Sequence, residues 1–351
     1  MSVRTPAPAH DVLALFPGIG EFGLTATRLH PRRGTPRRAG SHVGGPLAWP
    51  AGEPWPVCAA EHVVLREEPI PPPLLARLRA LRAQEPARRW PGIQAVLAEL
   101  ADRAPGFTGI ERGAEVATYQ VARAEPEPCP LVGLAQLRAA DVPDLRPPAG
   151  ADLLQVLWCP NDHDLGGGAL APAATVRWRR SGEVSPGPRA PAPTAVSHPA
   201  YLPRPCVLRP ERIVEYPWWQ ELPVQIGYEV MVWDAGHGGL YHRQLAAAPG
   251  WKVGGWPRWP TTDPRAFYCQ RCGDPMRQVL QVDSGEWGDV ARWRPERDGG
   301  GSAGEHNGSE GQGGGGEDSE AEPTGVIAGH TGLYRIFGCA SCPESVQVDL
   351  Q

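Results

Sequence analysis

Residues 43–50 read VGGPLAWP and residues 253–260 read VGGWPRWP, so the two stretches share Val, Gly, Gly, Trp and Pro without a gap. In both stretches a Gly-Gly pair is closely followed by proline, which predicts a turn beside a strand rather than the start of a helix. A stretch that recurs within one chain indicates an internal repeat. We therefore expect a duplicated, β-rich fold.

The similarity continues in the same order along the chain. Three further blocks match: Cys58 with Cys269, PLVGLAQL at 130–137 with PMRQVLQV at 275–282, and DLLQVLWC at 152–159 with GLYRIFGC at 332–339. The longer blocks are rich in Leu and Val and alternate weakly, as strands do. Because all the blocks align in one order, they indicate an internal duplication with diverged insertions.

The second copy carries two Cys-x-x-Cys pairs. Cys269 and Cys272 form the first pair, and Cys339 and Cys342 form the second. Four thiolates complete the tetrahedral shell of a structural zinc ion. Two disulfides or four unrelated cysteines are the alternatives, but this spacing in short turns is typical of zinc knuckles. The sequence therefore predicts a zinc site with four cysteine ligands.

The corresponding positions of the first copy are Cys58-x-x-x-His62 and Cys159-x-x-x-His163. A histidine close to a cysteine is often only a surface residue, so these pairs alone are a weak signal. Their alignment with the cysteine pairs of the second copy supports a second zinc site of Cys₂His₂ type.

Composition narrows the class of protein. The chain has 351 residues, 41% of them hydrophobic, with 43 Gly and 42 Pro, which favours short strands and many turns around a core. A net charge of −5 and a pI near 6.1 disfavour binding to nucleic acid or to anionic membranes. No apolar run reaches the length of a membrane span. The cysteines and a start without the pattern of a secretory signal predict a cytoplasmic protein whose cysteines bind metal.

These patterns predict a mainly β (α+β) protein, an internally duplicated β-sheet or barrel-like domain with zinc knuckles. The expected parts are an N-terminal extension (1–42), a first copy (43–163) with a helical insertion (63–128), a connecting segment (164–250), and a second copy (251–351) with a disordered insertion (295–324).

The two insertions differ in character. One helical face is expected to hold Leu74, Leu75, Leu78 and Leu81, and a second helix is expected around Ile93, Val96, Leu97 and Leu100. The centre of the second insertion is rich in Gly and acidic residues and lacks large apolar ones. Such a segment cannot offset the entropy lost on ordering, so we expect disorder.

Several single residues carry packing predictions. Trp49 and Trp259, at matching positions, are expected in the core, whereas Trp218 and Trp219 are better candidates for exposure at a binding surface. Cys129 and Cys206 have no counterpart in the other copy and are flanked by prolines. We expect both to be small buried residues.

The matching blocks resemble the YwqG-like family of bacterial domains, which share a Gly-Gly-x-Pro turn and strands with similar Gln-containing endings. The second copy is also similar to the programmed-cell-death-2-type superfamily of eukaryotes. The residues that carry this similarity are Gly254, Gly255, Pro257, Trp259, Cys269, Cys272, Gln281, Leu333, Tyr334, Phe337, Cys339 and Cys342. The resemblance implies a duplicated β-rich domain that binds other polypeptides, as a chaperone of a ribosomal protein in eukaryotes or as a suggested immunity protein in bacteria. The long insertions and the Cys-His pairs depart from both groups.

We therefore expect a non-enzymatic, zinc-stabilised module that binds an unknown protein or peptide partner, chaperone-like or toxin-immunity-like. An apolar cleft where the copies meet is the expected binding place. The alternative is a metal-dependent hydrolase that uses the first-copy site, with Asp162 and Asp164 beside His163. Four ligands leave no open position for water, which argues against catalysis. We expect no binding to nucleic acid or to membranes.

Overall fold

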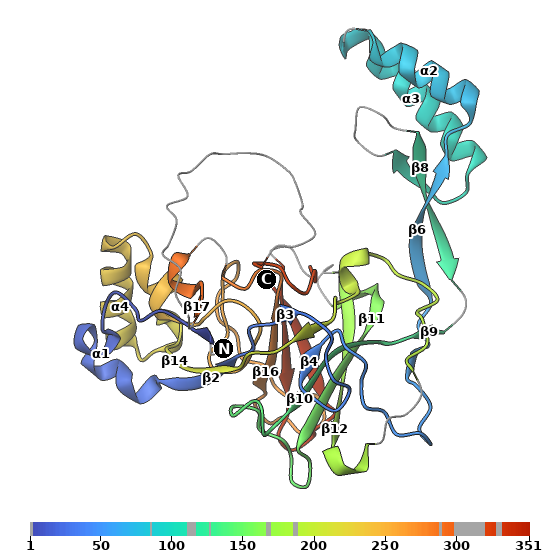
Figure 1. Ribbon diagram of the computed structural model, residues 1–351. Coiled ribbons are helices and arrows are strands. Elements are labelled where there is room, and N and C mark those ends of the chain that lie inside the picture. Colours follow the sequence, from blue (N-terminus) through green and yellow to red (C-terminus); the bar gives the residue numbers. More distant parts are fainter. Residues whose placement is uncertain are drawn as a thin grey trace.

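The computed structural model (Figure 1) describes residues 3–84, 86–110, 117–125, 128–165, 170–184, 189–287, 290–297, 320–327 and 332–351. Over these residues the chain is mixed α+β and mostly strands, and every described strand pair is antiparallel. This confirms the coarser part of the expected fold class, a mainly β (α+β) chain. None of the helices in this part of the chain combines the length and apolar character that a bilayer crossing requires.

Two large sheets, each with six described strands, form the body of the protein. The first sheet has the order β12 (Leu170–Arg179), β11 (Leu153–Asp164), β10 (Val132–Arg138), β4 (His42–Val43), β13 (Cys206–Val207) and β3 (Arg32–Arg33). The second has the order β14 (Glu211–Glu215), β2 (Leu24–Arg28), β15 (Lys252–Gly254), β16 (Arg277–Asp283), β18 (Leu333–Gly338) and β19 (Val346–Leu350). The matched sequence blocks thus form adjacent strands in each sheet.

The two sheets share the same strand register. Gln136 of β10 faces His42 of β4, and at the aligned positions Gln281 of β16 faces Lys252 of β15. The bulge between Gly133 and Ala135 recurs at the aligned positions of β16. Each glutamine also donates two hydrogen bonds to carbonyl oxygens of aligned residues, in the first sheet those of Arg38 and Gly40, and in the second those of Ala248 and Gly250. Residues that align in the two sequence blocks therefore occupy equivalent positions in the two sheets.

The two sheets exchange strands. The chain from 24 to 33 supplies β2 beside β15 in the second sheet and then β3 at the edge of the first. The chain from 206 to 215 does the reverse, with β13 beside β4 and β14 at the edge of the second sheet. The two segments pair along their length, because β2 pairs with β14 and β3 with β13. The segments expected to be an extension and a connection therefore belong to both sheets.

The second glycine of each VGG motif is explained by this exchange. A Cβ added to Gly255 would overlap with the carboxylate of Glu215 on β14, and one added to Gly45 would overlap with the ring of Pro36. Pro36 follows β3, as Glu215 ends β14, so both side chains lie at the exchanged edge strands. Gly255 also has a positive φ of 66°, which an L side chain rarely adopts.

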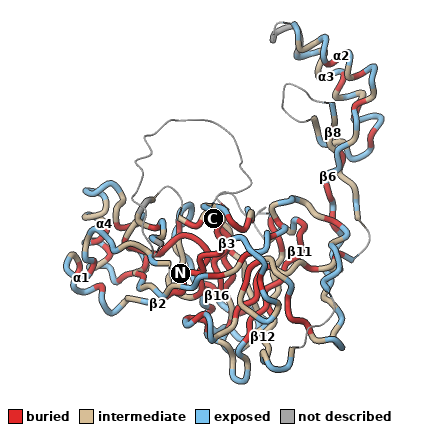
Figure 2. The backbone as a smooth tube through the Cα atoms, in the orientation of Figure 1, coloured by how far each residue is buried: buried red, intermediate tan, exposed pale blue. Residues whose placement is uncertain are grey.

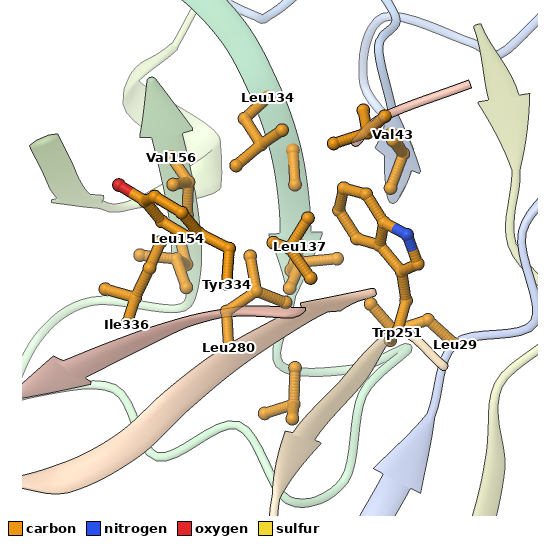
Figure 3. Close-up of a cluster of buried hydrophobic side chains, with 14 of the residues drawn as sticks. Leu29, Val43, Leu134, Leu137, Leu154, Val156, Trp251, Leu280, Tyr334 and Ile336 are labelled. Carbon is orange, nitrogen blue, oxygen red and sulfur yellow. The ribbon is translucent and has the colours of Figure 1, made fainter. Parts of the chain in front are cut away.

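The two sheets share one hydrophobic core. Figure 3 shows Leu134, Leu154 and Val156 of the first sheet pointing toward Tyr334 and Ile336 of the second. All five side chains are fully buried. Buried residues concentrate between the sheets throughout the body (Figure 2). Because neither sheet covers its own apolar face, the two copies are expected to fold together.

Trp49 and Trp259 lie in the core, as expected, at 1% and 2% exposure. Each is covered by a guanidinium group, that of Arg179 at 4.4 Å from the Trp49 ring centre and that of Arg335 at 4.0 Å from the Trp259 ring centre. Trp218 and Trp219, the better candidates for exposure, are more exposed than Trp49 and Trp259 but are still partly buried. Each packs against a separate buried cluster.

The insertion of the first copy forms an arm that projects from the body (Figure 1). Helices α2 (Pro72–Arg82) and α3 (Pro86–Arg103) form where expected, and Leu74, Leu78, Val96 and Leu100 are buried between them and the sheet below. The insertion is not only helical. It also contains a three-stranded sheet, in the order β6 (His62–Pro69), β8 (Thr118–Glu125) and β7 (Phe107–Ile110). The helices cover one face of this sheet, which gives the arm a small core of its own.

Smaller elements complete the described chain. Helices α1 (Val12–Leu15) and α4 (Val224–Gly236) share a buried cluster at one end of the body. Strand β5 (Val57–Cys58) pairs with β9 (Cys129–Pro130) at the root of the arm. Most of the expected disordered insertion, 298–319, lies outside the described residues. Its edges are ordered, because β17 (Glu296–Arg297) pairs with β1 (Val3–Arg4) and Thr324 is buried.

Candidate metal centres

The eight residues predicted as metal ligands come together in two groups. We call Cys58, His62, Cys159 and His163 the first metal group, and Cys269, Cys272, Cys339 and Cys342 the second metal group. Within each group the four ligand atoms lie within 4.8 Å of one another. Cysteine sulfur and imidazole nitrogen are ligands for zinc and related metals, so each group could hold one metal ion.

The second metal group is built from two tight turns. The first turn lies between Tyr268 and Pro275, which pair with each other as an isolated β-bridge. Within this turn the N–H of Gly273 donates to the carbonyl of Cys269 at 2.8 Å. Gly273 has a φ of +79°, so a glycine directly after the Cys-x-x-Cys pair is needed for the turn. The second turn links β18 to β19, and there the N–H of Ser345 donates to the carbonyl of Cys342.

The first metal group joins the body to the arm. Cys58 ends β5, and His62 begins β6 of the arm. Cys159 and His163 both lie on β11, Cys159 within the bulge between Trp158 and Asp162 and His163 directly after it. A metal ion held by all four ligands would therefore fix the root of the arm against the first sheet.

Distances within both groups fit a tetrahedral ion. Zinc with bonds of about 2.3 Å to sulfur and about 2.0 Å to nitrogen separates two sulfurs by about 3.8 Å and a sulfur and a nitrogen by about 3.5 Å. The Sγ atoms of Cys272 and Cys339 are 3.5 Å apart. In the first metal group, Cys58 Sγ is 3.8 Å from His163 Nε2, and Cys159 Sγ is 3.2 Å from His62 Nε2.

Burial shifts the pKa values of the side chains in the first metal group. It raises the pKa of the Cys159 thiol to about 12 and lowers the pKa values of His62 and His163 below their usual range. The imidazoles are therefore neutral near pH 7, as metal ligands must be. The buried thiol gives up its proton only when a cation replaces it, which couples metal binding to proton release.

Two neighbours of the first metal group were not predicted from the sequence. Asn161 Nδ2 lies 3.5 Å from the Sγ of Cys159 and 3.4 Å from the Sγ of Cys129. Cys129 is fully buried, as expected, but it also lies directly opposite Cys58 in the β5–β9 pair. It has no cysteine or histidine counterpart in the second copy, so the repeat offered no signal for this position.

A cleft of about 950 Å³ opens between the two sheets beside the second metal group. Val176 and Trp178 of β12 line it from the first sheet, and Phe267 and Met276 line it from the second copy. Cys339 and the turn that follows it form part of the wall. The cleft thus lies where the two copies meet, with one wall held by the second metal group.

No protein-family model matches the sequence. No curated protein matches it either. The resemblance to the YwqG-like family therefore depends on the residues quoted above.

Proposed function

We propose that the protein is a non-enzymatic binding module in which two duplicated, zinc-stabilised copies hold a cleft for an extended segment of a partner protein. The shared register and bulge of the two sheets support duplication, since separate origins would not place them at aligned positions. The partner is unidentified, and chaperone-like and toxin-immunity-like roles both suit such a module. Cytoplasmic localisation, without binding to nucleic acid or membranes, remains part of the proposal.

Zinc is the metal that best suits both groups. Tetrahedral sets of four thiolates, or of two thiolates with two imidazoles, bind zinc or an iron–sulfur cluster. In each group the four ligand atoms lie within 4.8 Å of one another, which leaves room for a single ion at the centre. We therefore propose one zinc ion in each group, where it would add directly to folding stability.

The cleft is the main support for the proposed binding function. Its volume of about 950 Å³ lies within the range of ligand sites, and its lining is mostly apolar with Trp178 at its wall. Aromatic and aliphatic walls of this kind take up the side chains of an extended peptide. Because Cys339 borders the cleft, zinc at the second metal group would keep that wall in place.

Catalysis by the first metal group is the second candidate function. Asp162 lies beside His163, but its carboxylate accepts the hydroxyl of Tyr201 at 2.8 Å. The four ligand atoms of the group also match a closed tetrahedron. A hydrolytic zinc site needs an open position for water. The geometry therefore favours a structural role for this group.

Selection of random peptides on the full chain tests the binding role. We expect enrichment of peptides with apolar residues, and loss of their binding when Trp178→Ala is introduced. Trp90→Ala is the matched control, because Trp90 lies on the arm, is 62% exposed, and does not line the cleft. Folding of both variants is checked by circular dichroism. Peptides that bind both variants as well as the parent chain would refute the cleft as the binding place.

A further inference from the structure

We propose that Cys58 and Cys129 form a redox-active dithiol, which on oxidation becomes a disulfide and withdraws Cys58 from the first metal group. This inference depends on the proposed zinc site at that group. Cys129 is not among the four ligands. It is a third thiol beside the two that belong to the group.

The β5–β9 pair brings the backbones of the two cysteines opposite each other. Cys58 and Cys129 are direct partners in this antiparallel pair. Residues that face each other in this way have Cα atoms about 4.5–5.5 Å apart, and side chains on the same face of the sheet. A disulfide needs Cα atoms about 4.4–6.8 Å apart. The backbones are therefore close enough for the bond, which needs a small local approach of the two Cβ atoms.

The exposure of the three thiols determines which of them is oxidised first. Cys58 is partly exposed, whereas Cys129 and Cys159 are buried at 0% and 1% exposure. An oxidant in solution therefore reaches Cys58 first. Cys129 is held in place, since its sulfur lies 3.4 Å from the amide nitrogen of Asn161 and 3.4 Å from the carbonyl oxygen of Ala195. It is positioned to react with an oxidised Cys58 rather than with the solvent.

The reaction balances with hydrogen peroxide as the oxidant. The Cys58 thiolate attacks one peroxide oxygen, the O–O bond breaks, and a sulfenic acid forms with release of hydroxide, which becomes water by taking up a proton from the buffer acid. The Cys129 thiol then attacks the sulfenic sulfur, so an S–S bond forms, the S–O bond breaks, and water leaves. The two thiols lose two electrons, and one peroxide is reduced to two waters. A dithiol of this kind in a reducing compartment is typical of redox sensing.

Oxidation would weaken the attachment of the arm to the first sheet. After oxidation, only His62, Cys159 and His163 remain as ligands, and a disulfide sulfur binds metal poorly. The disulfide keeps β5 joined to β9. The tie between His62 of the arm and β11 depends on the metal and is lost with it.

The second metal group has no such neighbour. The structure describes all eight cysteines, and the remaining one, Cys206, lies elsewhere with its sulfur against the carbonyl of Pro323. Cys206 is as fully buried as Cys129. It therefore provides a matched control for the loss of a buried thiol.

The test starts from the full chain loaded with zinc, whose zinc content is measured before treatment with hydrogen peroxide. Released zinc is followed with a colorimetric chelator, and disulfides are mapped by mass spectrometry of unreduced peptides. We expect two zinc ions per chain at the start, release of zinc on oxidation, and a peptide pair joined through Cys58 and Cys129. In Cys129→Ala the oxidised Cys58 has no partner thiol, so its peptide should carry a sulfenic or sulfinic acid in place of the disulfide. Cys206→Ala should behave as the parent chain.

Three results would overturn the inference, each in a recognisable way. A parent chain that begins with only one zinc ion removes the proposed first zinc site, and this inference with it. Two ions at the start without a Cys58–Cys129 peptide pair, or with a Cys129–Cys159 pair instead, refute the dithiol alone. If Cys129→Ala does not fold, the disulfide map of the parent chain still decides.

Discussion

The Nζ of Lys252 lies 2.7 Å from both carboxylate oxygens of Glu215, and both side chains are fully buried between the strands that carry them. Lys252 donates its third hydrogen bond to the carbonyl of Trp256 at 2.8 Å. Glu215 also accepts the N–H groups of Ala248 and Trp256. This ion pair fastens the exchanged edge strand β14 to the VGG turn of the second copy.

Replacing one member of this pair should be strongly destabilising. Lys252→Met leaves the carboxylate of Glu215 buried without its partner, which costs about 3–5 kcal/mol of unfolding free energy. Urea unfolding followed by circular dichroism measures the change. Arg66→Met is the control, because its ion pair with Glu125 is exposed and is worth less than about 1 kcal/mol. Adding Glu215→Leu to Lys252→Met should recover much of the loss, and failure to do so would contradict the argument from unpaired charge.

The second glycines of the VGG motifs should tolerate no side chain. Gly255→Ala forces a methyl group onto Glu215, and Gly45→Ala forces one onto Pro36, so each should lower the unfolding free energy by about 1–3 kcal/mol. Gly52→Ala is the control, since a Cβ there meets nothing within 4 Å. Thermal unfolding of the three variants measures the effect. Equal melting temperatures for Gly52→Ala and Gly255→Ala would show that the exchanged edge strand does not exclude a side chain at Gly255.

Each metal group should lose its own ion independently. Cys272→Ser removes a ligand of the second metal group, so the chain should retain about one of its two zinc ions and become less soluble, because metal binding contributes to folding. Cys58→Ser should remove the other ion and loosen the arm. Metal analysis by mass spectrometry, with protease sensitivity of the arm, separates the two. A parent chain with no bound zinc would remove both sites.

Acid should destabilise the protein through buried histidines. Burial lowers the pKa of His42 to about 4, and the unfolded chain has a value of about 6.5. The unfolded state therefore binds a proton first as the pH falls. The contribution of His42 to stability is complete above about pH 6.5 and is lost between about pH 6.5 and 4, by about 1.4 kcal/mol per pH unit. His42→Leu should flatten the dependence of unfolding free energy on pH by this amount, as measured by urea unfolding at a series of pH values.

Deletion of residues 299–318 should leave metal content and melting temperature nearly unchanged. This stretch has no large apolar side chain, and shortening a connection changes the entropy of loop closure only slowly, by about 0.6 kcal/mol for each halving of length. The deletion must stop before Ala321, whose carbonyl accepts the N–H of Glu286. Loss of zinc or solubility in the deleted chain would show that the segment contributes to the fold.

The amino-acid sequence determined the strands of the two copies, the helices of the arm and the two sets of ligand residues. These features are local or repeated. Strand patterns, the face formed by Leu74 and Leu78, and cysteine spacing depend on neighbours a few residues away. Repetition then placed Cys159 beside Cys58, as the aligned Cys339 lies beside Cys269.

Only the tertiary structure decided the strand exchange, the sheet within the arm and the position of Cys129 opposite Cys58. Strands of two residues, such as β3 and β13, are too short to carry a periodic signal. Their pairing is selected because it buries Leu29 and Leu208 in the shared core and satisfies backbone groups between segments far apart in the chain. Contacts of that kind depend on how the whole chain fills space, and no short stretch of sequence specifies them.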